Sequence, residues 1–437
     1  MRTALSPLGR LLRHIERVAP SHTVLPVPTE ESVPGYRVAI VCVGIAFTLT
    51  GLYMGSEIAA ELGWRRGVLA AVVGSVILAA MSIPAAVVGA QTRLSTYMIV
   101  RHVFGANGSR IVNAVLALVL VGWYAVTAEL FGRTCYLTVQ QYLPHSQVPM
   151  AAYTIGCSLL VVATTVFGFR ALDRLSLLVA PLLVALTAWV AFRSLGHASW
   201  QSVASSTGTA PDLGRGISAV VGGMIVNVVL MPDLTRYSRT VLDCALISVV
   251  GNGVANGVML VLAMIPAIAF GELDPMKYMA LLGLVPVAFA ILVLSTWSVN
   301  AVNLYSTGLV TATALPRASY GAVVIGSGLV GTGVALLGLS DRFLDFLVVL
   351  GLVVPPIAAV YIVDYFVLGR RDYSRPGAGR PGGRSHVHAL LAFGFGAAVG
   401  CGLYATKASI TGVPTIESFV AAAASYWGLE RWRRARE

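Results

Sequence analysis

The chain has 437 residues, of which 57% are hydrophobic and only 11% are charged, and its formal net charge is +11. Because soluble globular domains contain about 25% charged residues, a chain this poor in charge could not cover its surface in water. Together with a mean hydropathy of +0.81, this composition excludes a soluble protein and predicts one that lies in the lipid bilayer.

A hydropathy window of about 19 residues indicates twelve membrane-spanning helices. Residues 1–36 are polar and basic, so we expect a cytoplasmic tail there, then one transmembrane domain over 37–430 and a short C-terminal tail over 431–437. The predicted fold class is therefore an all-α polytopic membrane protein. The spans are expected near 37–62, 67–91, 110–135, 150–168, 175–195, 215–234, 242–270, 284–311, 318–338, 343–367, 387–406 and 412–430.

Basic residues are distributed unevenly among the predicted loops. With the N-terminus inside, most arginines fall on the inner side, as in the stretches 370–384 and 431–436. The outer side keeps few basic residues, namely Arg65, Arg66, Arg193, Lys277, Arg342 and Lys407. This asymmetry follows the positive-inside rule. We therefore expect both termini to be cytoplasmic in a cell-membrane protein, and we expect no nucleic-acid partner.

Cysteines and histidines offer little material for a metal or redox site. The five cysteines stand singly in apolar spans, and the seven histidines fall in tails, loops or span ends. We therefore expect no disulfide, no metal centre and no bound cofactor. An intramembrane enzyme would need a nucleophile with its base or a metal cluster, and a channel would need a continuous polar pore. The pattern indicates neither.

Two predicted spans are interrupted by glycines and polar residues. The first contains TLTGLYMGSE, with Gly51 and Gly55, and the sixth contains GGMIVNVVLMPD, with Gly222, Gly223 and Asn227. These spans open two five-span halves, and Gly-interrupted helices at matching positions of two halves indicate a transport site at mid-membrane. Close helix packing through small residues is the alternative explanation.

Four stretches resemble the nucleobase:cation symporter-1 family, which includes bacterial cytosine and purine/cytosine permeases. They are GWYAVTAELFG at 122–132, VVGGMIVNVVLMPDLTRYSR at 220–239, TWSVNAVNLYSTGL at 296–309 and PPIAAVYIVDYFVLGRRDY at 355–373. Their order and spacing are specific for the family, although not for its substrate. The resemblance implies a leucine-transporter-type fold with a five-plus-five inverted repeat, here 37–195 and 215–367, and two extra helices over 387–430.

The resemblance also implies a function. The chain would be a secondary active transporter that imports a nucleobase-like planar heterocycle by alternating access, coupled to a sodium ion or a proton. Cytosine, another pyrimidine, a purine, a hydantoin, allantoin or a vitamin precursor would fit, and an amino-acid or amine transporter of the same inverted-repeat fold is the alternative. We expect a monomer, not an enzyme, whose partners are its substrate and the lipid bilayer.

The resemblance implies a substrate site between helices one, three, six and eight. Trp123 occupies the family's stacking position, where an aromatic ring against a nucleobase contributes about 1–3 kcal/mol, and Thr127 lies four residues on, on the same helix face. A core or interfacial tryptophan is the alternative. Gly222 and Gly223 match positions whose backbone can bond the ligand. Met224 stands where cytosine permeases tend to place an aromatic residue, which puts cytosine itself in doubt.

Asparagines inside apolar spans need partners, because an amide carries two donors and one acceptor carbonyl and is costly to bury unpaired. The resemblance implies that Asn300, which follows the W-[ST]-T pattern of the family, lies in the substrate pocket. Asn227 faces either the ligand or helix one, and Asn303 has no family counterpart. Hydrogen bonding between helices is the alternative role for Asn300 and Asn303.

Coupling depends on a few further residues. Ser298 matches the first of two hydroxyl residues that ligate sodium in the family, but the second position is Val299, which has no side-chain oxygen. Glu57 follows the interrupted part of span one and could carry a coupling proton, because carboxylates inside spans are costly and usually functional. Glu61 could be only solvated near the outer end, and Glu129 is expected to face away from the pocket. This pattern favours proton coupling or ion-independent uptake over tight sodium coupling.

Overall fold

The computed structural model describes residues 26–209, 212–314, 319–370, 373 and 384–436. Over these residues the fold is all-helical, with two isolated β-bridges and no strand. Most of the predicted N-terminal tail, part of the arginine-rich stretch before the eleventh predicted span, and Glu437 lie outside the described residues.

The helices group into two compact units. The smaller unit holds Asn113–Val179 and Val285–Arg342, and the larger unit holds Thr23–Val112, Ala180–Leu284 and Phe343–Glu437. Each unit takes segments from both predicted halves of the chain, so the units do not coincide with the halves. The inverted repeat itself stays a prediction.

The smaller unit is built on four helical segments around one apolar core. Tyr124, Phe131, Val161, Leu304 and Val324 are buried together in that core. Its elements are the later part of α4 (Thr96–Tyr142), the first part of α5 (Met150–Ser194), α12 (Val285–Ala314), α13 (Tyr320–Ala335) and the short η3 (Leu339–Arg342).

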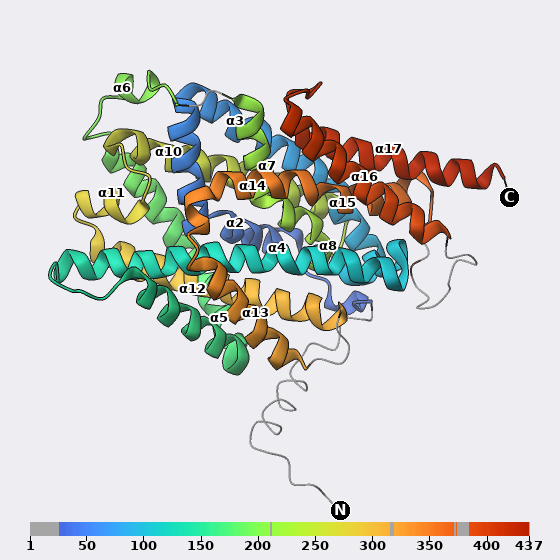
Figure 1. Ribbon diagram of the computed structural model, residues 1–437, viewed down its shortest axis with the longest axis horizontal. Coiled ribbons are helices and arrows are strands. Elements are labelled where there is room, and N and C mark those ends of the chain that lie inside the picture. Colours follow the sequence, from blue (N-terminus) through green and yellow to red (C-terminus); the bar gives the residue numbers. More distant parts are fainter. Residues whose placement is uncertain (1–25, 210–211, 315–318, 371–372, 374–383, 437) are drawn as a thin grey trace, which may run out of the picture. The chain divides into compact units, whose positions relative to one another are not determined.

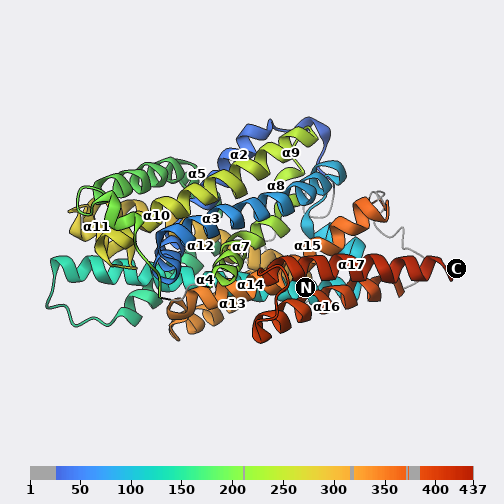
Figure 2. The ribbon, with the colours of Figure 1, turned by 90° about the horizontal axis from the view of Figure 1, so that it is seen from above.

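The larger unit contains the remaining helices. Within it α3 (Leu49–Thr92) packs along α10 (Asn256–Phe270) and α7 (Leu213–Val229), and α16 (Arg384–Thr406) packs along α17 (Pro414–Arg434), as Figures 1 and 2 both show. Its further elements are η1 (Thr29–Glu31), α2 (Gly35–Ala46), α6 (Trp200–Ala204), α8 (Met231–Thr235), α9 (Val241–Ile247), the π-helix η2 (Ser248–Ala255), α11 (Pro275–Leu281), α14 (Phe343–Val353), α15 (Pro355–Ile362) and η4 (Val363–Val367).

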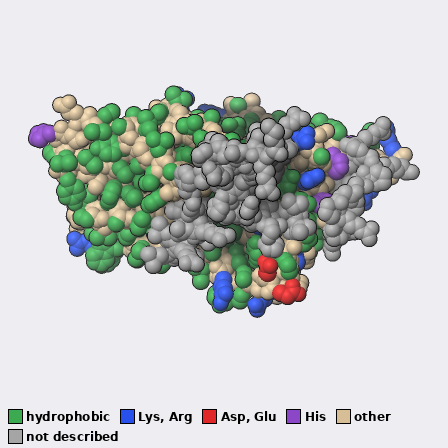
Figure 3. Space-filling view, turned by 90° about the horizontal axis from the view of Figure 1, so that it is seen from below, with side chains coloured by type: hydrophobic (Ala, Val, Ile, Leu, Met, Phe, Trp, Pro, Cys, Tyr) green, Lys and Arg blue, Asp and Glu red, His purple; other side chains and the backbone are tan. Residues whose placement is uncertain are grey.

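The apolar helices fit a multi-pass membrane protein. In the described chain, six helices are long and apolar enough to cross a bilayer, and five shorter apolar helices accompany them. On the face drawn in Figure 3, hydrophobic side chains cover much of the described surface and charged side chains are few. The helix α17, which covers the twelfth predicted span, is in neither group, so the count of twelve stays a prediction.

The first predicted span is broken, but not at its glycines. Helix α2 ends at Ala46, Phe47 is extended with ψ 95, and Thr48 caps α3 by accepting a hydrogen bond from the N–H of Gly51. The break therefore includes the first residue of TLTGLYMGSE, Thr48, but not its glycines. Gly55 lies inside α3 instead, where a Cβ would overlap α10, so its role in the fold is close helix packing.

The sixth predicted span shows the same displacement. Helix α7 runs without interruption through Gly222 and Gly223 and ends before Leu230, whose φ of −88 and ψ of 4 separate it from α8. A Cβ on Gly222 would overlap the carbonyl oxygen of Leu347, and one on Gly223 would lie 2.6 Å from Sδ of Met54. The two glycines therefore let α14 and α3 approach α7.

The predicted loop between spans one and two is reduced to one residue. Gly63, with φ 70 and ψ −176, kinks the 44-residue α3. A Cβ there would lie 2.5 Å from the carbonyl oxygen of Ser206, and this backbone conformation is accessible almost only to glycine. The two predicted spans are therefore joined by a kink at Gly63 rather than by a separate loop.

Candidate functional site

Two candidate substrate residues lie on α4 in the smaller unit. The indole of Trp123 is half-buried, and the hydroxyl of Thr127 is buried and donates to the carbonyl oxygen of Trp123 over 2.6 Å. This bond satisfies the Thr127 donor within its own helix. The next residue, Tyr124, is fully buried and its Oη donates to the carbonyl of Ser158 over 3.3 Å, which fixes the rotation of α4 in the unit.

The helix α12 carries two buried side chains whose polar atoms have no partner among the described residues. Asn300 is 0% exposed and Ser298 is 1% exposed. In the described part of the chain, the Asn300 amide makes no hydrogen bond at its nitrogen or its oxygen, and the Ser298 hydroxyl makes none either. An unmade buried hydrogen bond costs about 1–3 kcal/mol, and groups left in this state commonly await a water, an ion or a ligand.

Neighbouring polar residues on α12 are satisfied, which sets these two apart. Thr296 and Thr307 each donate to a carbonyl four residues earlier, over 2.6 and 2.8 Å. Trp297 packs on the core of the smaller unit and donates from Nε1 to Oγ1 of Thr164 over 3.0 Å. Asn303, which has no family counterpart, is half-buried and its carbonyl accepts the Thr307 bond.

Glu129 has a structural role in the smaller unit. It is 3% exposed, and its carboxylate accepts hydrogen bonds from the backbone N–H and the hydroxyl of Ser340 over 2.9 and 2.6 Å. Glu129 thus holds η3 to α4. This agrees with the expectation that it faces away from a substrate site.

The remaining candidate substrate residues lie on α7 in the larger unit. From Val221 to Val229 the side chains are buried except at Gly223 and Asn227, which are half-buried and lie one turn apart. Met224 is buried at 9% exposure. Gly223 and Asn227 therefore lie on the less buried side of α7, although Met54 of α3 packs closely on Gly223.

Asn227 belongs to a polar chain that sequence reasoning missed. Its Nδ2 donates to Oδ1 of Asn252 over 2.8 Å, Nδ2 of Asn252 donates to Oγ of Ser82 over 2.9 Å, and Ser82 donates to Oγ of Ser248 over 3.0 Å. Asn252, Ser82 and Ser248 are fully buried. The motif GNGVANG at 251–257 was the available signal, because it places two amides in an apolar span.

Two acidic residues of α3, Glu57 and Glu61, belong to the larger unit. Glu57 is half-buried. Glu61 pairs with Arg215, which also pairs with Asp345. The expectation that Glu61 is merely solvated is therefore wrong.

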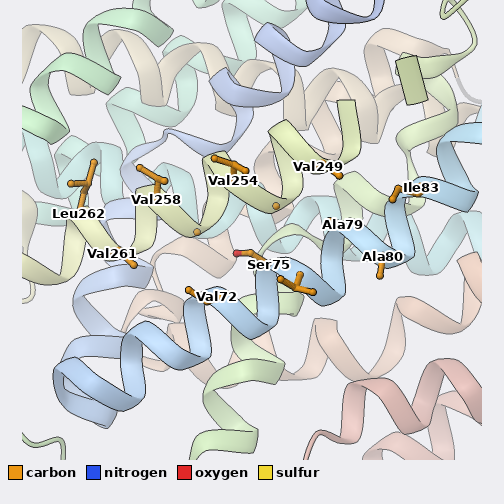
Figure 4. Close-up of a pocket in the computed structure, with 13 residues that line it drawn as sticks. Val72, Ser75, Ala79, Ala80, Ile83, Val249, Val254, Val258, Val261 and Leu262 are labelled. Carbon is orange, nitrogen blue, oxygen red and sulfur yellow. The ribbon is translucent and has the colours of Figure 1, made fainter. Parts of the chain in front are cut away.

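One cavity of the larger unit is apolar. It has a volume of about 640 Å³ and lies between α3 and the η2–α10 segment, lined by residues such as Val72, Val76, Val254 and Val258. Figure 4 shows that valines, alanines and Leu262 surround it, with Ser75 as the polar residue. None of the candidate substrate residues lines it, and it lacks the polar groups that would orient a heterocycle. The apolar lining of this groove therefore does not suit a substrate site for a heterocycle.

The described residues offer no metal centre. No group of three or more His, Cys, Asp or Glu is arranged to hold an ion in the part of the chain that the structure describes. Cys135 and Cys157 of the smaller unit lie 3.6 Å apart as free thiols.

Comparison with known proteins agrees with the apolar, interrupted helices. The family model described as "Permease for cytosine/purines, uracil, thiamine, allantoin" matches residues 26–426. The protein is thus a multi-pass membrane transporter and not an enzyme. It belongs to this family of permeases, which confirms the family predicted from the four sequence motifs.

Individual relatives give the same result. The chain is 28% identical to a cytosine permease of Escherichia coli O157:H7 over 383 residues, covering 86% of this chain and 87% of the relative. It is 27% identical to the cytosine permease of Escherichia coli strain K12 over the same length and coverage.

Solved structures identify the fold. The inward-facing conformation of Mhp1 matches with a TM-score of 0.82 at 17% identity, covering 100% of this chain and 95% of that one. A closed conformation of Mhp1, a nucleobase-cation-symport-1 family transporter with bromovinylhydantoin bound, matches with a TM-score of 0.74 at 19% identity, over 94% and 95% of the two chains. A Na+-coupled sialic acid symporter shares the fold more distantly, with a TM-score of 0.62 and 12% identity over 96% and 94%.

Proposed function

We propose that this permease imports a planar, amide-like heterocycle of the nucleobase type across the cell membrane by alternating access. The observation that carries the proposal is Asn300, which is fully buried on α12 with both ends of its amide unpaired among the described residues. An amide offers donors and an acceptor side by side, which complements the mixed edge of a pyrimidine, a purine or a hydantoin. Family membership and the cytosine permease relatives support the same substrate class.

The candidate substrate-binding residues of this proposal are Trp123, Thr127 and Asn300 on α4 and α12, and Gly222, Gly223, Met224 and Asn227 on α7. Trp123 supplies a half-buried aromatic surface for stacking, Asn300 supplies hydrogen bonds, and Gly223 and Asn227 supply polar groups on the less buried side of α7. Gly222 is packed against Leu347. As a glycine it could contact a substrate only through its backbone. Met224 would provide an apolar contact at the position where the resemblance to cytosine permeases implies an aromatic residue.

Coupling to a proton through Glu57 completes the proposal, with sodium at Ser298 as the alternative. Val299 cannot coordinate a cation, whereas the unpaired hydroxyl of Ser298 could accept one. The transporter would work as a monomer with both termini in the cytoplasm.

The substrate class can be tested by a thermal-shift screen of the purified protein, because a ligand that binds only the folded state raises the melting temperature. The panel contains cytosine, uracil, adenine, hydantoin, allantoin, leucine and choline. We expect a rise with at least one ring compound and none with leucine or choline. A rise confined to leucine or choline would contradict the proposal and favour an amino-acid or amine transporter of the same fold.

A further inference from the structure

The hydrogen bonds of the polar chain in the larger unit all run in one direction. Asn227 donates to Asn252, Asn252 donates to Ser82, and Ser82 donates to Ser248. Because Oδ1 of Asn252 accepts from Asn227, the amide of Asn227 turns its Nδ2 inward. The carbonyl oxygen Oδ1 of Asn227 has no hydrogen-bond partner in the described part of the chain, so it can accept a hydrogen bond from a ligand.

The position of Asn252 depends on an unusual backbone. Ser248 and Asn252 both lie in the π-helix η2 (Ser248–Ala255), and both reach the hydroxyl of Ser82 on α3. Runs of π-helix inside α-helices are rare and often mark functional sites. The opposite side of η2 carries Val249 and Val254, which line the apolar groove. The π-helix therefore separates a polar face, which meets α3 and α7, from an apolar one that lines the groove.

The hydrogen bond to Asn252 limits the rotation of the Asn227 side-chain amide. Asn227 is half-buried on α7, while its neighbours Val226 and Val228 are buried. A side-chain amide that is free to turn by 180° presents either a donor or an acceptor at the same place. A fixed bond to one end of the amide decides which of the two faces outward.

We propose that Asn252 is a positioning residue that fixes the orientation of the Asn227 amide, so that the pair selects among heterocycles by their pattern of donors and acceptors. Asn252 is fully buried and acts through Asn227 rather than by touching the substrate. The inference rests on the proposed function, because it assumes that α7 contacts a nucleobase-like ring. It adds a residue of the seventh predicted span to the substrate site, which the family resemblance assigns to helices one, three, six and eight.

The test uses cytosine and uracil, two rings of nearly the same shape that exchange donor and acceptor at N3 and at the C4 substituent. Dissociation constants for both are measured by calorimetry on the purified full-length chain. Asn252→Leu removes the partner of Asn227, and we expect it to change the ratio of the two constants about tenfold, the equivalent of about one hydrogen bond. Ser82→Ala, a smaller change for which folding is less at risk, should move the ratio in the same direction by less.

A second Asn–Ser pair between the same two segments of the chain provides matched controls. Nδ2 of Asn256 donates to Oγ of Ser75 over 3.0 Å, and both residues are 3% exposed. This pair has the same chemistry and burial but does not bond Asn227. Asn256→Leu and Ser75→Ala should therefore leave the cytosine-to-uracil ratio unchanged, even where they lower the melting temperature.

Three outcomes separate the two proposals. A ratio that moves with Asn252 and Ser82 but not with Asn256 and Ser75 supports the positioning role. A wild-type protein that binds a pyrimidine, with a ratio moved by neither pair or equally by both, contradicts the role of Asn252 alone. A wild-type protein that binds neither pyrimidine contradicts pyrimidine recognition and with it this role.

Discussion

Nη2 of Arg215 lies 3.1 Å from Oε1 of Glu61 and 3.1 Å from Oδ1 of Asp345. One guanidinium thus joins the start of α7 to α3 and to α14 within the larger unit. The Arg215 and Glu61 side chains are 27% and 21% exposed, whereas Asp345 is 57% exposed. Arg215 is therefore the centre of the triad, and the bond to Asp345 is the more strongly screened one.

This geometry predicts an order of stabilities. Arg215→Gln removes both pairs and leaves two carboxylates near each other, so it should lower the free energy of unfolding by about 1 kcal/mol or more. Glu61→Gln should cost less, and Asp345→Asn should cost about 0–0.5 kcal/mol. Melting temperatures of the purified variants at low and at high salt measure the order. Equal effects of Arg215→Gln and Asp345→Asn on the melting temperature would show that Arg215 is not the centre of the triad.

Trp123 should be required for transport but not for folding. Its indole is only half-buried, so Trp123→Ala should remove most uptake, through the loss of about 1–3 kcal/mol of stacking, with little change in melting temperature. Trp123→Phe should restore part of the uptake because it keeps an aromatic face. Uptake of a radiolabelled ring compound into cells measures both.

Trp297 provides the matched control in the same unit. Its ring packs on the core and its Nε1 donates to Thr164, so Trp297→Phe should lower stability by about 0.5–1.5 kcal/mol and keep uptake. If Trp123→Ala retains uptake within about twofold, a difference of less than 0.5 kcal/mol, the indole has no place in the site.

Asn300 should show opposite effects on stability and on binding. Because both ends of its buried amide are unpaired among the described residues, Asn300→Leu removes a cost of about 1–3 kcal/mol and should raise the melting temperature of the ligand-free protein. The same variant should lose the thermal shift given by the ring compound that binds the wild type. Asn300→Asp, which replaces the amide donor by an acceptor, should weaken binding by about 1–3 kcal/mol.

Asn303, one turn further along α12, is the control. It is half-buried, so Asn303→Leu should change neither the ligand-free melting temperature nor the thermal shift by a comparable amount. An Asn300→Leu variant that melts lower than the wild type and still responds to ligand would return Asn300 to a role in helix packing.

Much of the architecture was predictable, because long apolar runs in a bilayer can only form helices. The exact place of the helix breaks was not. Glycine tolerates a break but is equally useful where two helices touch, and Gly55 and Gly222 serve the second purpose. The breaks fall at Phe47–Thr48 and at Leu230. These residue types do not by themselves predict a helix break.

The candidate site was predictable only where a side chain acts alone. The burial of Asn300 followed from its apolar surroundings, whereas the partner of Asn227 is a residue 25 positions away on a helix that the motifs do not include. Glu61 and Arg215 are likewise paired across 154 positions. Hydrogen-bond partners between helices depend on packing, and one sequence without its tertiary contacts does not contain that information.

The coupling ion can be assigned from two substitutions that act on different candidate groups. Ser298 has a buried hydroxyl without a partner among the described residues, but the next residue is Val299, so the hydroxyl pair implied by the family is incomplete. A hard cation needs several oxygen ligands, which a single hydroxyl does not supply. Glu57, half-buried on α3, offers instead a carboxylate inside a membrane span, and such groups commonly take part in proton relays.

We therefore expect proteoliposomes that contain the wild-type protein to accumulate a bound ring compound under an imposed pH gradient and to respond weakly to an imposed sodium gradient. Glu57→Gln has the same shape but cannot release a proton, so it should abolish the response to the pH gradient while the ligand still raises the melting temperature. Val299→Thr restores the second hydroxyl and should gain a response to sodium. Glu61→Gln, which alters a carboxylate already paired with Arg215, is the control and should keep the pH response. Strong sodium-driven uptake by the wild-type protein, with Glu57→Gln indifferent, would show that Ser298 and backbone carbonyls suffice for a sodium site and that Glu57 carries no coupling proton.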